Sequence, residues 1–287
     1  MDRARAGIRG GAAASAAASA LAGVRVVGGV AATFATANGA TRPRSVRERD
    51  GYRMRFPRDG SGLQGVVINT GGGVAGGDAV AIALEAQANA DVLVTTQSAE
   101  RVYRALDGAD TEINLDLVAA DGARLVWIPH ETILFDRSHV TRRLEANVAS
   151  SARLLIVETL VFGRKAHGET VASGHVADRW RIRREGRLIF ADTLRLTGDV
   201  ASILASPMIA DGAHAVSTVV YVAPDAEERL DAVRAQIARS KCRLAASAFD
   251  GLVIIRAVAN EMSALRRALT ALVPLLSGRD APRQWHA

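Results

Sequence analysis

The stretch VVINTGGGVAGGDAV, residues 66–80, can be interpreted in two ways, and the choice between them decides the fold. Gly71, Gly73 and Gly76 follow a short apolar run with the G-x-G-x-x-G spacing of a dinucleotide-binding turn. Such a turn must be followed by a helix, because the pyrophosphate binds to the free N–H groups at the helix N-terminus. From Val80 onward, however, apolar residues recur at every second position, which is the period of a strand. The sequence therefore predicts a glycine-rich turn between two strands.

The Walker-type phosphate loop does not fit this stretch either. It needs Lys and then Ser or Thr after its glycines, and Gly77 and Asp78 stand there instead. Glycine allows positive φ or a close backbone approach in a tight turn. The alternative, a dinucleotide-binding oxidoreductase built on this loop, would need a helix from Asp78 onward. We predict structural turn roles for Gly71, Gly72, Gly73, Gly76 and Gly77.

Short strand-like runs recur along the chain up to about residue 222. Ala90, Ala123, Ala152 and Gly186 each precede such a run, at spacings of 33, 29 and 34 residues. Repeats of this length suggest stacked β-layers in which each layer covers the apolar face of the last. We therefore predict a mainly β fold of stacked, solenoid-like sheet layers. Three of the runs follow a period-two segment, namely AVAIALEAQ (79–87), TEINLDLVA (111–119) and TRRLEANVA (141–149).

The C-terminal third has a different pattern. Leu230, Val233 and Ile237 recur at helical spacing after Pro224, which predicts one α-helix. A second helix is predicted after Asn260 by apolar residues at 262, 265, 269 and 272. The segment between them predicts a hairpin that turns at residues 250–251. The expected architecture is two helices packed on a mostly β body.

Composition limits the domain organisation and the partners. The 287 residues are 49% hydrophobic, which is enough for a full-sized core. We divide the chain into a disordered Ala-rich tail (1–23), a single β-rich domain (24–278) and a C-terminal tail (279–287). The net charge is +6, but the arginines are mixed with 30 acids, so we expect no nucleic-acid partner. No apolar stretch is long enough to span a membrane. The single cysteine, Cys242, fits a reducing compartment, with the cytoplasm as the default.

Several carboxylates stand beside or inside apolar runs. Glu131 and Asp136 bracket residues 132–135, Glu169 follows a glycine, and Glu158 interrupts the apolar run LLIVETLVF. A carboxylate in such a run is costly to bury unless it is paired, solvated or bound to a cation. The histidines have no ligand spacing, so we expect no tightly bound metal or other cofactor. A β-solenoid enzyme acting on saccharides through paired acids stays open as an alternative, and would need two carboxylates close together in a groove.

Two further stretches are predicted to contact partners. The polar segment TTQSAERVYRA (95–105) follows an apolar strand and forms a plausible recognition surface. Around Trp180, arginine alternates with large apolar residues, so the arginines lie on one strand face and could bind an acidic partner. The candidate partner-binding residues are Thr95, Thr96, Gln97, Glu100, Tyr103, Arg104, Arg181 and Arg183.

Together these stretches resemble the UreD family, also called UreH, of urease accessory proteins. The resemblance extends from about residue 24 to 278, and the order and spacing of its motifs match. The chain departs from the common family pattern at Asn69, where histidine is common, and at His130, where glutamine is common. The motifs are INTGGGVAGGD (68–78), TTQSAERVYR (95–104), WIPHETILFDRS (127–138), ETLVFGRKAHGE (158–169) and DRWRIRREGRLIFADTLRL (178–196).

The resemblance implies a non-catalytic scaffold or chaperone, with a mostly β fold and two helices. It implies that the protein joins a UreF-type accessory protein and a UreG-type GTPase on the urease apoprotein, where nickel is inserted. In that family metal travels through an internal passage, and oxygen ligands suit a borderline ion that must be released again. The glycine loop would then be structural, and the nucleotide would belong to the GTPase. The residues that the resemblance suggests for a transient nickel passage are Asp78, Glu131, Asp136, Glu158 and Glu169.

Overall fold

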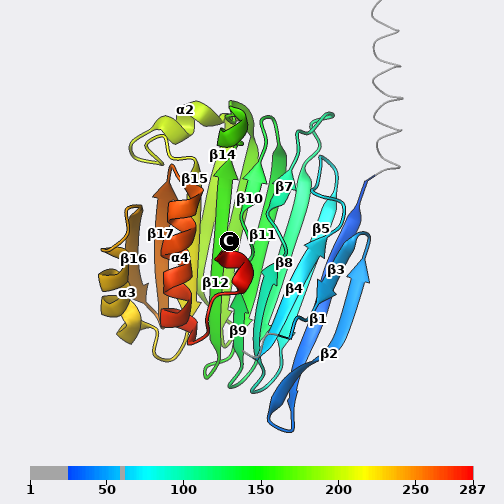
Figure 1. The fold of residues 1–287 in the computed structure, drawn as a ribbon, viewed down its shortest axis with the longest axis vertical. Coiled ribbons are helices and arrows are strands. Elements are labelled where there is room, and N and C mark those ends of the chain that lie inside the picture. The colour runs from blue at the N-terminus through cyan, green and yellow to red at the C-terminus, as the bar shows by residue number, and fades with distance from the viewer. Residues whose placement is uncertain (1–24, 59–61, 287) are drawn as a thin grey trace, which may run out of the picture.

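The computed structural model describes residues 25–58 and 62–286, and the predicted tail at 1–23 lies outside these residues. The fold is two β-sheets packed face to face, with the two longer helices on one side (Figure 1). The seven-stranded sheet has the order β14 (Arg187–Asp199), β13 (Ser173–Arg184), β11 (His139–Val148), β8 (Thr111–Ala119), β5 (Ala79–Ala86), β1 (Val27–Ala37) and β2 (Ala40–Arg49). The ten-stranded sheet has the order β16 (Arg243–Phe249), β17 (Leu252–Ala259), β15 (Ala215–Val222), β12 (Arg153–Phe162), β9 (Arg124–Trp127), β6 (Asp91–Thr96), β4 (Leu63–Asn69) and β3 (Tyr52–Arg55). Off this path, β10 (Thr132–Leu134) pairs with β12, and β7 (Glu100–Val102) pairs with β10.

The predicted stacked layers are present. The chain alternates between the sheets, so that β5, β8 and β11 pair in parallel in one sheet while β6, β9 and β12 pair in parallel in the other. Ala90, Ala123 and Ala152 each precede aligned strand starts and are at most 1% exposed. A small residue is needed at this corner because the next coil lies directly against it.

The fourth predicted repeat, at Gly186, is wrong. The run after Gly186 belongs to β14, which pairs antiparallel with β13 in the seven-stranded sheet. Glu185 and Gly186 both have positive φ and form a hairpin turn, so the chain reverses instead of starting another coil. The spacing of 34 residues resembled the repeat, but the turn chemistry decides the topology.

Strand alternation divides the core into two parts. Along β12, Leu154, Ile156 and Leu160 face the space between the sheets, whereas Leu155 and Val157 face the helix side. The first set joins the large core between the sheets. The second packs against the buried face of α4 (Met262–Ser277), and burying one such side chain contributes about 1.5–3 kcal/mol.

Both predicted helices are present, as α3 (Leu230–Ile237) and α4, and the predicted hairpin is β16–β17. A third helix, α2 (Val200–Ala205), was not expected from the sequence. Asp199 caps it by accepting a hydrogen bond from the Ser202 N–H at 2.9 Å, but six residues are too few for a helical repeat to show. Short 3₁₀ segments complete the fold: η1 (Lys165–His167), η2 (Glu227–Arg229) and η3 (Arg283–Trp285).

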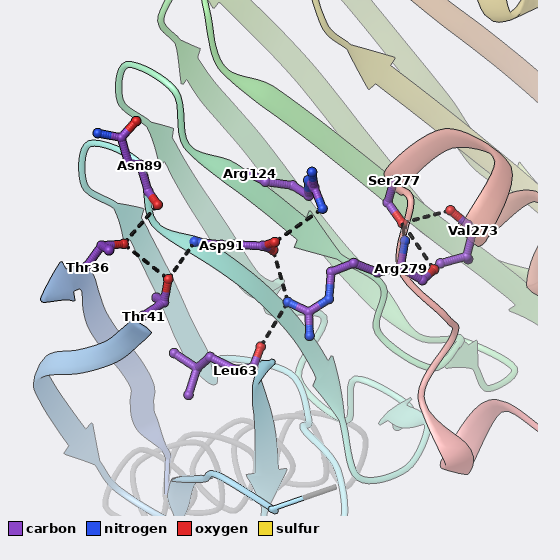
Figure 2. Close-up of polar contacts among 9 residues, drawn as sticks. All are labelled: Thr36, Thr41, Leu63, Asn89, Asp91, Arg124, Val273, Ser277 and Arg279. Atoms are coloured by element: carbon purple, nitrogen blue, oxygen red, sulfur yellow. Dashed lines mark hydrogen bonds and ion pairs between the residues drawn. The ribbon is translucent and has the colours of Figure 1, made fainter. Parts of the chain in front are cut away.

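Two arginines link the end of α4 to the first residues of β4 and β6 (Figure 2). Arg279 donates to the Leu63 carbonyl and to Asp91 Oδ1, both at 3.1 Å, and Arg124 donates to Asp91 Oδ2 at 3.2 Å. Beyond this point the described part of the predicted C-terminal tail packs on the body. Trp285 is buried and its Nε1 donates to the Ile128 carbonyl at 3.1 Å.

Arg279→Ala should lower the free energy of unfolding by about 1–3 kcal/mol, because the Leu63 carbonyl loses this donor and Asp91 keeps only its pairing with Arg124. Urea unfolding followed by circular dichroism measures the loss. Arg283→Ala, at an exposed position nearby, is the control and should be close to wild type. Equal midpoints for the two variants would show that the Arg279 contacts do not stabilise the fold.

Candidate functional site

The glycine loop connects the two sheets and holds no helix. It runs from β4 to β5, and the strand predicted after Asp78 is present as Ala79–Ala86, so the helix required for dinucleotide binding is absent there. Gly72, Gly73 and Gly77 have positive φ. A Cβ at Gly73 would lie 2.7 Å from the Arg101 carbonyl oxygen, which explains why glycine stands there.

A polar network ties this loop to the neighbouring coil. Asn69 accepts a hydrogen bond from the Gly71 N–H at 2.9 Å, and its Nδ2 donates to Glu100 Oε1 at 2.9 Å and to the Tyr52 hydroxyl at 3.0 Å. The Tyr52 hydroxyl donates to Glu100 Oε2, also at 2.9 Å. These residues surround a small cavity of about 40 Å³. The Glu100 carboxylate therefore accepts hydrogen bonds from side chains inside the protein.

Burial sets the proton affinity of this network. It raises the pKa of Glu100 above its usual value, although hydrogen bonds from Asn69 and Tyr52 act in the opposite direction. Burial and the nearby Glu100 carboxylate also raise the pKa of Tyr52. As pH falls, Glu100 is therefore protonated at a higher pH than an exposed glutamate would be.

The second polar site interrupts the core between the sheets. Arg142 of β11, Glu158 of β12 and Asp178 of β13 are 8%, 5% and 7% exposed, respectively. The Arg142 guanidinium donates to Asp178 Oδ2 at 3.1 Å and also to Glu158 Oε2. Trp127 Nε1 donates to Glu158 Oε1 at 2.6 Å. We call Arg142, Glu158 and Asp178 the buried charge cluster.

A cavity of about 320 Å³ adjoins the buried charge cluster, between β11, β13 and β14 of one sheet and β12, β15 and β17 of the other. Asp192 and Arg256 add a second ion pair to its wall, with Arg256 Nη2 donating to Asp192 Oδ2 at 2.7 Å. Three carboxylates and two guanidinium groups therefore line one space. Carboxylates of this kind can supply oxygen ligands to a cation.

Burial and charge compete within the cluster. Burial raises the pKa of Asp178, while the Arg142 guanidinium pulls it down and Glu158 raises it further. Burial alone would lower the pKa of Arg142, but Asp178 and Glu158 outweigh it and raise the pKa. Arg142 thus stays charged and is the counter-ion for two buried carboxylates.

Asp78 and Glu131, two of the predicted acids, are engaged elsewhere. The Asp78 carboxylate accepts from the N–H groups of Val26 and Ala75, each at 2.8 Å, and so holds the glycine loop against the start of β1. Glu131 accepts from Arg266 Nη2 at 2.9 Å through both carboxylate oxygens. Both acids are therefore paired inside the protein.

Asp136 and Glu169 lie next to each other. Asp136 accepts from the N–H groups of Ala172 at 2.9 Å and Ser173 at 3.1 Å, and Glu169 pairs with Arg164 at 2.6 Å. Of the five predicted acids, only Asp136 and Glu169 thus lie together. Within residues 25–58 and 62–286, no group of three or more His, Cys, Asp or Glu side chains is arranged to hold a metal ion.

The candidate partner-binding residues divide into exposed and internal ones. Gln97, Tyr103, Arg104 and Arg181 are exposed, and β13 shows the predicted alternation, with arginines opposite the buried Trp180. The other four make internal contacts: Thr95 donates to the Ile128 carbonyl, Thr96 accepts from the His130 N–H, Glu100 belongs to the Asn69 network, and Arg183 pairs with Glu145.

Sequence reasoning missed Arg142, Asp178, Asp192 and Arg256. A signal was available for the first two, since the alternation of β11 and β13 places Arg142 and Asp178 on the same faces as buried apolar residues. Their contact was not readable, because it depends on which strands pair.

Strand pairing also brings together His139 and His175, which are far apart in the sequence. They lie opposite each other in β11 and β13, with ring centroids 6.2 Å apart. His139 Nδ1 is 3.1 Å from the Gly108 carbonyl oxygen, and His175 Nδ1 is 3.0 Å from Thr197 Oγ1. Both rings are therefore held in place by neighbouring polar groups.

The fold and the site define a two-sheet, solenoid-like protein with paired charges in its interior and a structural glycine loop. A family model described as "UreD urease accessory protein" matches residues 26–286. A urease accessory protein UreD of Methylobacterium sp. (strain 4-46) is 48% identical over 255 residues, covering 87% of this chain and 90% of that protein. The corresponding protein of Xanthobacter autotrophicus is 44% identical over 261 residues (91% and 90%), and that of Azorhizobium caulinodans is 39% identical over 262 residues (91% and 96%).

The chain belongs to the UreD family of urease accessory proteins, and so has a role in urease assembly. The expectation drawn from the sequence motifs is therefore confirmed at the level of the family. Among the described residues, no helix has the length and apolar character needed to cross a membrane.

Glu100→Gln should flatten the pH dependence of stability. Because the pKa of Glu100 is raised in the folded protein, the folded state keeps a proton that the unfolded chain releases near pH 4.5. The free energy of unfolding should therefore fall as pH rises through the raised pKa, by at most about 1.4 kcal/mol per pH unit for this one group. Urea unfolding between about pH 4.5 and pH 7 measures the slope. The exposed control Glu228→Gln should keep the wild-type slope, and identical slopes for both variants would contradict the assignment.

Arg142→Met should lower the free energy of unfolding by about 3–5 kcal/mol at neutral pH, because two buried carboxylates lose their counter-ion. The neutral triple variant Arg142→Met, Glu158→Gln, Asp178→Asn should stay within about 2 kcal/mol of wild type, since it removes the charges together and keeps an acceptor for Trp127. Chemical denaturation compares the two. If the single variant is as stable as the triple variant, the three charges are not coupled.

Proposed function

We propose that the chain is a non-catalytic scaffold for urease assembly, which binds the urease apoprotein together with a UreF-type accessory protein and a UreG-type GTPase. Membership of the UreD family supports the assembly role. The glycine loop enters a strand, which supports the view that the GTPase brings the nucleotide. We place the protein in the cytoplasm, where its single cysteine, Cys242, stays reduced.

Nickel is the cargo in this proposal, and the cavity beside the buried charge cluster is its route. The observation that carries the proposal is a cavity lined by the carboxylates of Glu158, Asp178 and Asp192. Carboxylate oxygens bind a borderline divalent ion less tightly than thiolates do, so the ion can leave again. When nickel is absent, Arg142 pairs with Glu158 and Asp178, and Arg256 pairs with Asp192. An arriving cation competes with these guanidinium groups for the carboxylates.

The remaining candidate acids extend the route in this proposal. β10 lies between Glu131 and Asp136 in the sequence and pairs with the end of β12, the strand that carries Glu158. Asp136 and Glu169 lie together just beyond β10. Nickel would contact Glu131, Asp136 and Glu169 before or after it passes the cavity. Asp78 keeps its structural place in the glycine loop between β4 and β5.

Partner contacts involve the exposed members of the predicted set: Gln97, Tyr103, Arg104 and Arg181. The Tyr103 ring packs edge-on against Phe135 at 4.9 Å, and its hydroxyl donates to the Gly72 carbonyl at 3.1 Å, so this aromatic group is already fixed before a partner arrives. Fixed aromatic side chains bind at a low entropic cost.

The neutral triple variant should reduce nickel in co-expressed urease by at least tenfold, because it removes the charges that attract and release the cation. The chain is co-expressed with the urease subunits and the UreF-type and UreG-type proteins. The complex is recovered through a tag on the chain, and nickel and urease activity are measured. Partner recovery should equal that of wild type, since the altered residues are buried.

The matched control is Glu228→Gln with Asp280→Asn, which removes two exposed carboxylates and should leave the nickel content unchanged. Wild-type nickel content in the neutral triple variant would overturn the passage proposal. If the unaltered chain recovers no urease component and activation does not depend on it, the scaffold proposal itself is wrong.

A further inference from the structure

Arginine is concentrated in one short part of the chain. Residues 42–58 contain seven arginines, at positions 42, 44, 47, 49, 53, 55 and 58, with only Glu48 and Asp50 as acids. Counted over the whole chain, basic and acidic residues are mixed, because acids in other segments offset the arginines of this run. In the structure it forms β2 and β3, the edge strands of the two sheets.

Strand register places three of these arginines on one face. Arg49 pairs with Gly29, Arg47 with Ala31 and Arg42 with Ala35 of β1. In β1, Val30, Ala32 and Phe34 face the core. The β1 residues that alternate with them therefore point outward, and so do the β2 residues paired with those outward residues. Arg42, Arg47 and Arg49, which we call the β2 arginine row, are therefore exposed on the outer face of the seven-stranded sheet.

The β2 arginine row has no internal counter-ion among the described residues. Glu48, the acid of the same strand, pairs with Arg53 and Arg55 and accepts a hydrogen bond from the Met54 N–H at 2.8 Å. Neighbouring like charges without acids repel one another, which is unfavourable for the isolated protein.

A flat floor of small residues lies beside the row. Ala31 of β1 pairs with Ala83 of β5, and Ala81 is the next outward residue of β5. The two strands approach closely here, since a Cβ at Gly29 would lie 1.9 Å from the Ala81 carbonyl oxygen. Helices α3 and α4 pack on the other sheet, so neither of them covers this face (Figure 1).

We infer that this face, made of the β2 arginine row and the alanine floor, is a docking surface for a protein partner that presents carboxylates beside a flat apolar strip. The inference rests on the proposed scaffold function and names one of its surfaces. Charge complementarity sets the class of partner, because guanidinium groups bind carboxylates in paired geometry. The alanine methyl groups allow an apolar strip to approach the sheet closely.

Two other modes of binding are disfavoured. A protein that binds single-stranded nucleic acid without sequence preference stacks the bases on aromatic groups, and the outward positions of Val27–Arg49 and Ala79–Ala86, all of them described, hold none. Addition of a partner strand along β2 is opposed by Pro43, which lacks an N–H, and by the register shift opposite residues 33–34. The face of the sheet is therefore the contact, and its edge is not.

The test uses a fluorescently labelled poly-L-glutamate 15-mer and anisotropy at low and high salt. Arg42→Glu, Arg47→Glu, Arg49→Glu should weaken binding at least tenfold. The control Arg239→Glu, Lys241→Glu, Arg267→Glu makes the same change of charge at exposed residues on the helix side and should bind as wild type. Alanine versions of both variants guard against misfolding caused by charge reversal.

Equal losses for the two variants would overturn the inference, because attraction would then depend on net charge alone. Tighter binding of a 20-base-pair DNA that is lost in the β2 variant would overturn the choice of a protein partner. In the co-expressed urease assembly, the β2 variant should lose at least one component that the control keeps. Failure of the unaltered chain to recover any component would overturn the scaffold function, and the peptide experiment would still decide the docking surface.

Discussion

Parallel register between successive coils is the constraint on which the rest of the structure depends. In a parallel ladder, equivalent residues of neighbouring coils lie opposite each other, so a property placed at one position must suit every coil. The corner positions Ala90, Ala123 and Ala152 are all small for this reason. The same register places Arg142 opposite Asp178, which are 36 residues apart in the sequence.

The buried charge cluster is the costly consequence of that register. Carboxylates and a guanidinium between two apolar sheets lose their hydration, and their mutual attraction only partly compensates. A well-packed apolar core would serve stability at least as well. Stability therefore does not explain the paired charges beside the cavity, and the proposed nickel route would give them a functional reason.

Local pattern predicted the parts of the fold that depend on neighbours in sequence. Period-two alternation predicted β5, β8 and β11, helical spacing predicted α3 and α4, and the residues after the glycines distinguished a turn from a nucleotide loop. Strand pairing was beyond reach, and with it the contact of Arg142 with Glu158 and Asp178. The hairpin at Gly186 resembled a further coil because its spacing matched, and the concentration of arginines at 42–58 was hidden by counting charges over the whole chain.

The two sheets separate the features that a scaffold with a cargo would need. Helix α4 packs on β12 and β17 of the ten-stranded sheet, and Arg279 with Arg124 and Asp91 fixes the end of that helix (Figure 2). Neither α3 nor α4 packs on the outer face of the other sheet. Within that sheet β2 lies at one edge, whereas β11 and β13, which carry part of the buried charge cluster, lie toward the other. A partner docked over β2, as inferred above, would thus leave the proposed passage beside the buried charge cluster uncovered.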